Sequence, residues 1–195
     1  MDDDPEFLEY DRGELLFFWY SAARYGRVDV MKWAHQQGYS RVWENTDYLF
    51  MGEFEGCHDH NICKQAAKYG QLDALRCLIA IGCGWDEEIC CAAAEYGHLS
   101  ILKWARENGC DWDYRTCSSA AGGGHLNILQ WARENGCDWD RRTCSSAAKS
   151  GHLNILQWAR ENGCPWDKRT YASAQYSGNS EVLKYVIDQG CPSDN

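Results

Sequence analysis

The feature that most constrains this chain is a segment of 27 residues that is followed at once by a near copy of itself. Residues 110–136 read CDWDYRTCSSAAGGGHLNILQWARENG, and residues 137–163 read CDWDRRTCSSAAKSGHLNILQWARENG. The copies differ at three places: Tyr114 against Arg141, Gly122 against Lys149, and Gly123 against Ser150. A constant period of this length predicts equal supersecondary units stacked in a row, each too small to bury its own apolar face.

Glycines extend this period over most of the chain. One series is Gly82, Gly109, Gly136, Gly163 and Gly190, and a second is Gly70, Gly97, Gly124, Gly151 and Gly178. The predicted repeats are therefore 56–82, 83–109, 110–136, 137–163 and 164–190, with a degenerate first copy at 13–38. Because no linker separates the repeats, we expect one domain over residues 13–191, preceded by an acidic lead-in at 1–12.

An insertion, residues 39–55, separates the first copy from the second. Its sequence, YSRVWENTDYLFMGEFE, is too aromatic for a solvated linker. The first copy is also unusually apolar at the end of the array, where it carries Leu15, Leu16, Phe17, Phe18 and Trp19. Either the insertion folds back over these side chains, or they form a surface for a partner.

Local signals divide each repeat into two short helices. An aspartate stands where an N-cap is expected, at Asp86, Asp113, Asp140 and Asp167. The first helix is rich in cysteine, serine and alanine, and the second has larger apolar residues at helical spacing and ends at a glycine. The first helices are therefore predicted to be small enough for close packing, while the second helices fill the gaps.

The net charge and the composition of the first residues argue against several classes of partner. The chain has 19 basic and 29 acidic residues, for a formal net charge of −10, which repels phosphate backbones and anionic lipids. The first residues, MDDDPEFLEYD, are acidic where a signal peptide is basic, and no apolar run has the ~20 residues of a membrane span. We expect a cytoplasmic monomer that binds neither nucleic acid nor membrane.

Most of the twelve cysteines follow the repeat. They form two ladders, Cys83, Cys110, Cys137, Cys164 and Cys191, and Cys63, Cys90, Cys117 and Cys144. A residue that recurs in register fills an equivalent packing position, which favours buried, reduced thiols over disulfides or metal ligands. Cysteine, serine and histidine also recur together, as in Cys117, Ser118 and His125, but repetition is typical of packing, so we predict no enzyme activity and no cofactor.

One cluster stands partly outside the period. Cys57, His58, His60 and Cys63 are residue types that bind Zn²⁺, although their spacing matches no known zinc motif. The alternative to a binding scaffold is therefore a metal- or redox-responsive cysteine-rich module. A helix start of mixed composition explains the same residues.

The sequence GHLNILQWARENGCDWD resembles the second half of an ankyrin repeat. Matching positions are Gly124, His125, Leu126, Ile128, Leu129, Gly136, Cys137, Asp138, Trp139 and Asp140. The resemblance implies an all-α, ankyrin-like α-solenoid of about six helix-turn-helix repeats. A typical ankyrin repeat has about 33 residues, and the missing ones fall where the family forms its β-hairpin finger, so short loops are expected. Short repeats of this kind resemble those expanded in giant DNA viruses and protists, and a viral origin would place the protein in the host cytoplasm or nucleus.

Variation between the copies indicates where a partner would bind. The positions that vary at the two ends of the first helix include Glu87, Tyr96, Tyr114, Arg141, Lys149, Lys168 and Tyr176. In ankyrin-like proteins the first helix and the finger line the concave face, so the resemblance implies that these side chains bind a protein partner. A solvated face that is free to vary predicts the same pattern, and both interpretations remain open.

Overall fold

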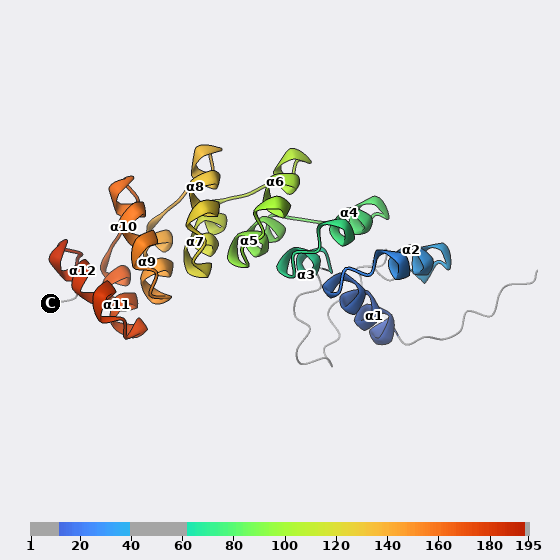
Figure 1. Cartoon of the computed structure of the whole chain (residues 1–195), viewed down its shortest axis with the longest axis horizontal. Helices are drawn as coiled ribbons and strands as arrows, with labels where there is room; N and C mark the ends of the chain where they lie inside the picture. Colours follow the sequence, from blue (N-terminus) through green and yellow to red (C-terminus); the bar gives the residue numbers. More distant parts are fainter. Residues whose placement is uncertain (1–11, 40–61, 194–195) are drawn as a thin grey trace, which may run out of the picture. The chain divides into compact units, whose positions relative to one another are not determined.

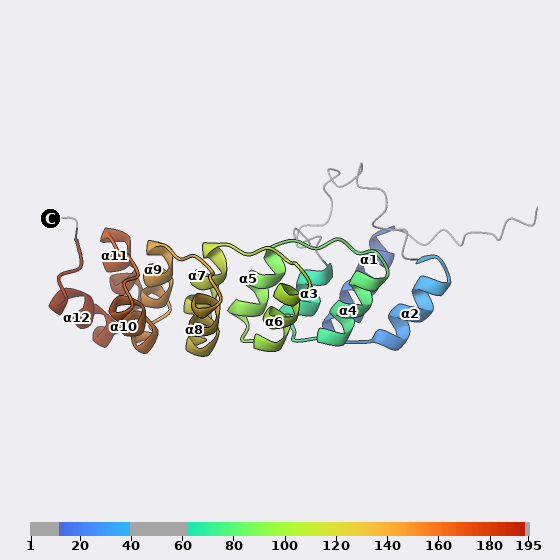
Figure 2. The ribbon, with the colours of Figure 1, turned by 90° about the horizontal axis from the view of Figure 1, so that it is seen from above.

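The computed structural model describes residues 12–39 and 62–193, and in these ranges the chain is helical, with twelve α-helices and no strand (Figure 1). Consecutive helices pair into hairpins, in the order expected from the sequence (Figure 2). The hairpins are α1 (Arg12–Arg24) with α2 (Val28–Gln36), α3 (Ile62–Lys68) with α4 (Leu72–Ala80), α5 (Glu88–Glu95) with α6 (Leu99–Glu107), α7 (Tyr114–Gly123) with α8 (Leu126–Glu134), α9 (Arg141–Lys149) with α10 (Leu153–Glu161), and α11 (Lys168–Ser177) with α12 (Ser180–Asp188). The predicted all-α, ankyrin-like fold class is confirmed.

The chain divides into two compact units, one ending at Trp85 and the other beginning at Asp86. Helices α1–α4 belong to the first unit and α5–α12 to the second. A single continuous domain over residues 13–191 stays a prediction, and the insertion at 39–55 lies outside the described residues except for Tyr39.

The second unit is built on a row of first helices. Helices α5, α7, α9 and α11 pack side by side, and each contacts the second helix of its own hairpin. The contact surfaces of α7 are small residues such as Cys117 and Ala120, while α8 contributes Ile128 and Leu129, and all four are fully buried. Small side chains let the first helices approach closely, and the larger second-helix residues fill the remaining core, as the sequence predicts.

Aspartates cap the first helices at the predicted positions. The carboxylates of Asp113, Asp140 and Asp167 accept hydrogen bonds from the backbone N–H two residues later, at 2.8, 2.8 and 2.9 Å. Asp86 accepts the equivalent bond from the Glu88 N–H at 3.0 Å. Each cap satisfies a backbone donor that the helix itself leaves unpaired, a contribution of about 1 kcal/mol per helix.

The loops between hairpins are fixed by arginine and tryptophan. The Arg133 guanidinium donates to the Cys137 carbonyl, and its Cζ lies 4.4 Å from the centre of the Trp139 ring. The Trp139 ring in turn meets the Trp158 ring edge to face, with 5.8 Å between centroids. The loop is thus held between two hairpins by an arginine of the preceding one and a tryptophan of its own.

In the second unit, a histidine of the next hairpin packs against the turn inside the preceding hairpin, as at Gly97 and Gly124. Gly124 has a φ of +86°, which favours glycine, and a Cβ added there would come within 2.9 Å of the His152 ring. Gly97 stands in the same relation to His125, whose Nε2 lies 3.1 Å from the Glu95 carbonyl oxygen. The His125 ring thus packs against the turn of the preceding hairpin and lies within hydrogen-bonding distance of its backbone.

The described cysteines are free thiols, and all of them except Cys83 are buried. Cys137 illustrates their shared role, since its Sγ lies 3.3 Å from the carbonyl oxygen of Asp113 in the preceding hairpin. Cys164 and Cys191 contact Asp140 and Asp167 in the same way, at 3.4 and 3.5 Å. The recurring cysteines are core residues that join neighbouring hairpins, as predicted from their spacing.

Candidate functional site

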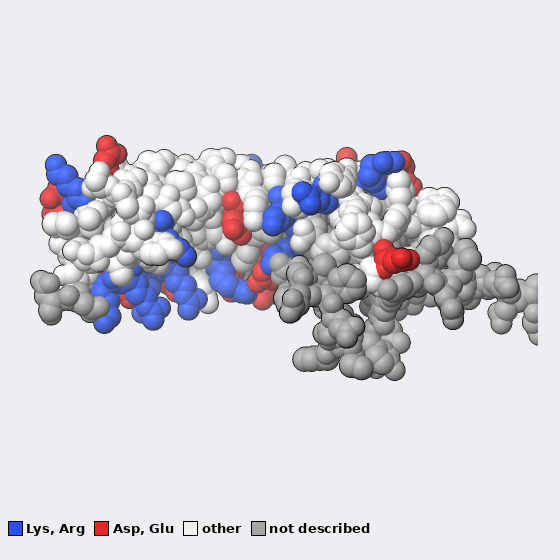
Figure 3. Space-filling model, turned by 90° about the horizontal axis from the view of Figure 1, so that it is seen from below, with Lys and Arg blue, Asp and Glu red and all other residues white. Residues whose placement is uncertain are grey.

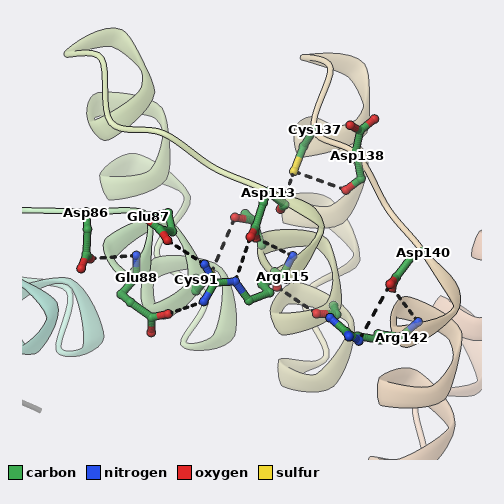
Figure 4. A network of polar contacts seen from close by, with 12 residues as sticks. Asp86, Glu87, Glu88, Cys91, Asp113, Arg115, Cys137, Asp138, Asp140 and Arg142 are labelled. Atoms are coloured by element: carbon green, nitrogen blue, oxygen red, sulfur yellow. Dashed lines mark hydrogen bonds and ion pairs between the residues drawn. The ribbon is translucent and has the colours of Figure 1, made fainter.

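The N-terminal ends of α5, α7, α9 and α11 lie in one row, because these helices pack side by side and begin within one position of the same point of the repeat. Figure 4 shows residues at the first three of these ends. We call this surface the N-terminal row and define it by residues 86–88, 113–115, 140–142 and 167–169. Four of the predicted partner-binding residues belong to it: Glu87, Tyr114, Arg141 and Lys168.

Arg115 joins the first two helices of the row. Its Nε lies 2.9 Å from Asp113 Oδ2 on its own capping residue, and its two terminal nitrogens lie 2.8 Å from Glu87 Oε1 and Glu88 Oε1. Three carboxylates thus surround one guanidinium, which raises the pKa of Arg115. The pKa of Glu87 is lowered, first by a hydrogen bond from its own backbone N–H and then by Arg115.

Tyr114 and Arg142 connect α7 to α9. The Arg142 Cζ lies 4.6 Å from the centre of the Tyr114 ring, and the Arg142 Nε lies 3.9 Å from Asp140 Oδ2. Figure 4 shows Arg142 beside the cap of its own helix, in the same position that Arg115 takes one hairpin earlier. Tyr114 is half-buried by this contact, so it presents one edge of its ring rather than a free side chain.

Arg141 continues the row to α11. Its Nε lies 3.2 Å from Asp167 Oδ2, and half of its side chain remains exposed. Lys168 and Arg169, the first two residues of α11, are exposed. Figure 3 shows lysine and arginine side chains gathered along the lower edge of the C-terminal helices.

The remaining predicted residues lie at the other end of the first helices. Tyr96 follows α5 and is 42% exposed, Lys149 ends α9, and Tyr176 near the end of α11 is 80% exposed. The Lys149 Nζ lies 6.0 Å from the centre of the Tyr176 ring. The length of a first helix, roughly 13 Å for nine residues, separates this group from the N-terminal row. The structure therefore places the predicted residues in two groups, and among them Lys149 and Tyr176 contact each other, while Glu87, Tyr114 and Arg141 contact other residues of the row.

Sequence reasoning missed the constant basic residues of the N-terminal row: Arg115, Arg142 and Arg169. They stand two residues after the capping aspartates in the last three repeats, and our prediction used only positions that vary between copies. The signal was present in the repeated pattern Asp-x-Arg-Thr, where a cation follows each cap. Arg115 and Arg142 contact the capping aspartates before them, which accounts for their recurrence whether or not they also contact a partner.

The alternative metal cluster falls mostly outside the described residues, because Cys57, His58 and His60 lie in the segment 40–61. Cys63 is a buried residue of α3. Among the described residues no group of three His, Cys, Asp or Glu side chains could hold a metal ion. Cys117 is fully buried, and its contact with Cys137, followed by burial, raises the pKa of its thiol, which is the opposite of an activated nucleophile.

A shallow hollow of about 350 Å³ lies on the first unit, and its walls come from α1, α2 and the turn between them. Phe17, Phe18 and Val30 contribute apolar surface, and Phe17 is 73% exposed. Trp19, in contrast, is fully buried, and its Nε1 donates to the Tyr39 carbonyl at 3.1 Å. The aromatic residues of the first copy thus divide between core and surface.

None of the helices described here is both long enough and apolar enough to cross a membrane.

Comparison with known proteins agrees with the repeat. The family model described as ankyrin repeats (many copies) matches residues 90–133, which extend from α5 into α8. No curated protein matches the chain. The match lies inside a row of helical hairpins that share its period, and it identifies residues 90–133 as ankyrin repeats.

Proposed function

We propose that this protein is a binding scaffold that recognises a protein partner through the exposed ends of its first helices, and that it carries out no reaction itself. Ankyrin repeats generally mediate protein–protein interaction. In the second unit a buried core, capped helices and fixed loops hold the first helices in place. A preorganised surface of this kind loses little conformational entropy when it binds.

One observation carries the proposal, namely the place of the differences between the two near-identical repeats. All three differences lie at the ends of the first helix, whereas the buried residues of the two hairpins are the same. Exposed positions on the second helices are also the same, as in Asn127 and Asn154, or Glu134 and Glu161. A solvated surface free to vary would be expected to change there too, so the pattern supports selection on the first-helix ends.

The residue types at these ends suit an interface. Tyr114, Arg141 and Tyr176 are of the kinds that contribute most binding energy in protein interfaces. Tyr114 and Arg141 are already held by contacts with Arg142 and Asp167, which reduces the entropy lost on binding. Tyr176 is the most exposed large aromatic residue described, and it extends the surface to the other end of α11.

Affinity capture from the source cells, with quantitative mass spectrometry, tests the proposal. The bait is the full chain, compared with a triple variant, Tyr114→Ala, Arg141→Ala and Tyr176→Ala. The matched control changes three exposed second-helix residues, Asn127→Ala, Asn154→Ala and Glu161→Ala. We expect the first variant to lose the captured partner at least about tenfold and the control to retain it.

Circular dichroism and thermal unfolding establish that both variants are folded before capture. The proposal is wrong if the first-helix variant keeps every partner of the wild type. It is also wrong if the control variant loses the same partner to the same extent, because the surface would then lie on the second helices.

A further inference from the structure

Charge changes sign along the N-terminal row. At α5 the row has three carboxylates, Asp86, Glu87 and Glu88. At α7 one aspartate is balanced by Arg115, while at α9 and at α11 two cations accompany a single aspartate. In a chain with a net charge of −10, this is a local reversal, and Figure 3 shows the basic side chains gathered over these C-terminal helices.

The cations over α9 and α11 keep much of their surface in solvent. The side chains of Arg141 and Arg142 are 50% and 49% exposed although each faces a carboxylate. Among the described residues, the Arg169 guanidinium has no ion-pair partner, and Lys168 beside it is exposed. The two carboxylates of this part, Asp140 and Asp167, also accept the cap hydrogen bonds from backbone N–H groups. The excess charge is therefore positive and accessible.

The loop before α11, unlike the loop before α9, reinforces this excess. The loops before α7 and α9 each expose an aspartate, Asp111 and Asp138, but Pro165 stands at that place before α11. The repeat that contains α11 therefore lacks the loop carboxylate that the two preceding repeats have. Helix N-termini add partial positive charge to the same edge, here from α9 with nine residues and α11 with ten.

We propose that the N-terminal row over α9 and α11 docks an acidic, extended segment of the partner protein, with the carboxylates of that segment on Arg141, Lys168 and Arg169. This inference rests on the proposed function and names the chemistry of its partner. Arginine and carboxylate pair in a fork geometry that gives direction as well as attraction. The three carboxylates at α5 repel the same segment, so its acidic part lies over α9 and α11 and not over α5.

The spacing of the first helices sets the spacing of the acidic residues. Packed helices lie about 8–10 Å apart, and an extended peptide advances about 3.3 Å per residue. Acidic residues about three positions apart therefore match successive first helices. A nucleic-acid backbone fits less well, because Asp140 and Asp167 interrupt the cations and the protein as a whole is acidic.

The test uses fluorescein-labelled peptides of equal length and the full chain, measured by fluorescence anisotropy at low and at physiological salt. In one dodecapeptide glutamates recur every third residue among glycine and serine; in a second the same glutamates are contiguous at one end; in a third lysine replaces every glutamate. We expect the first to bind most tightly, the second more weakly and the third not at all. Binding of the first weakens as salt rises.

Charge-reversal variants locate the site. Lys168→Glu with Arg169→Glu is expected to weaken binding of the spaced peptide at least about tenfold. The control, Lys32→Glu with Lys184→Glu, makes the same change in net charge at exposed residues of α2 and α12 and is expected to bind like the wild type. Equal loss in both variants, no binding of the spaced peptide, or tighter binding of a single-stranded DNA of similar length overturns the inference.

The same variants separate this inference from the proposed function. A captured partner that is lost with Tyr114→Ala, Arg141→Ala and Tyr176→Ala but retained by Lys168→Glu with Arg169→Glu would leave the binding scaffold intact and refute the acidic segment. Loss of the partner in both, with retention by the control of matched charge, supports both proposals.

Discussion

The α7–α8 and α9–α10 hairpins have the same length and differ at three residues, yet their first helices end differently. Helix α7 extends to Gly123, whereas α9 ends one position earlier in the repeat, at Lys149, although both turns contain a glycine in the left-handed conformation, Gly124 and Gly151. The buried residues are the same in both. The comparison teaches that the shared residues specify the hairpin, while the ends of the first helix can change without disturbing it.

The end of α7 lies close to the neighbouring hairpin. A Cβ added to Gly123 would lie 2.1 Å from the Glu95 carbonyl oxygen, so α7 approaches α5 closely at this point. A Cβ at Gly122 would meet only Ser146 Cβ, at an ordinary 3.6 Å. Of the two glycines that distinguish this repeat, one is therefore required by packing and the other is not.

The largest expected effect tests whether the two cores are equivalent. Ile128→Ala and Ile155→Ala each remove a fully buried side chain and are expected to lower the free energy of unfolding by about 2–5 kcal/mol. Because both sites take the same position in near-identical hairpins, the two losses should agree within about 1 kcal/mol. Urea unfolding followed by circular dichroism measures both, and a clear inequality would show that the twin cores differ.

The next effect exchanges residues between the twins. Gly123→Ser puts the α9 residue into α7, where its Cβ meets the Glu95 carbonyl, and should destabilise the protein by about 1–3 kcal/mol. Gly122→Ala, one residue away, is the control and should be neutral or stabilising by up to about 1 kcal/mol, since alanine is the better helix former. Thermal unfolding distinguishes them, and similar losses in both would refute the close approach of α7 to α5.

A smaller effect concerns a buried hydroxyl. Thr143 is fully buried, and in the part of the chain that the structure describes its Oγ1 makes no hydrogen bond of ordinary geometry. Thr143→Val should therefore stabilise the protein by about 1 kcal/mol. At the twin position the Thr116 Oγ1 lies 3.9 Å from Cys91 Sγ, so Thr116→Val should gain less. Equal gains in chemical denaturation would show that this thiol contact contributes nothing.

The smallest effect is electrostatic. The folded-state pKa of Glu87 is depressed, so its stabilising contribution is present above the ordinary glutamate pKa of about 4.3 and is lost as the pH falls through the folded value. Arg115→Met should move the pKa of Glu87 upward, although the bond from its own N–H keeps part of the depression. Carbon-detected NMR titration measures this shift. The twin change, Arg142→Met, should leave Glu87 unaffected, and an equal shift there would mean that Arg115 has no specific role.

The hairpins could be predicted from the sequence because the residue types at each helix end and core position recur in five or six copies of the repeat. Asp113 and its equivalents, the turn glycines and the buried cysteines could all be assigned from register alone, and the structure places them as expected. The contacts between repeats could not, because a periodic pattern does not say which side chain of one hairpin meets which of the next. Arg115 between Glu87 and Glu88, and Arg142 over Tyr114, depend on the distance between neighbouring first helices.

The candidate surface was only partly predictable for a related reason. Variation between copies identified Tyr114, Arg141 and Lys168, but it could not show that they lie in one row with the constant Arg142 and Arg169. Nor could it separate this row from Tyr96 and Tyr176, since residues at opposite ends of a short helix vary equally well. Only the shared starting point of the first helices, seen in space, brings the cations together.

A histidine packs against the turn of the preceding hairpin, so the support of that turn depends on residues later in the chain. Gly97 is covered by His125 and Gly124 by His152, so the turn of each of these hairpins is finished only by residues translated after it. We therefore expect that, during synthesis on the ribosome, the turn of such a hairpin is supported only after about one further repeat has been made.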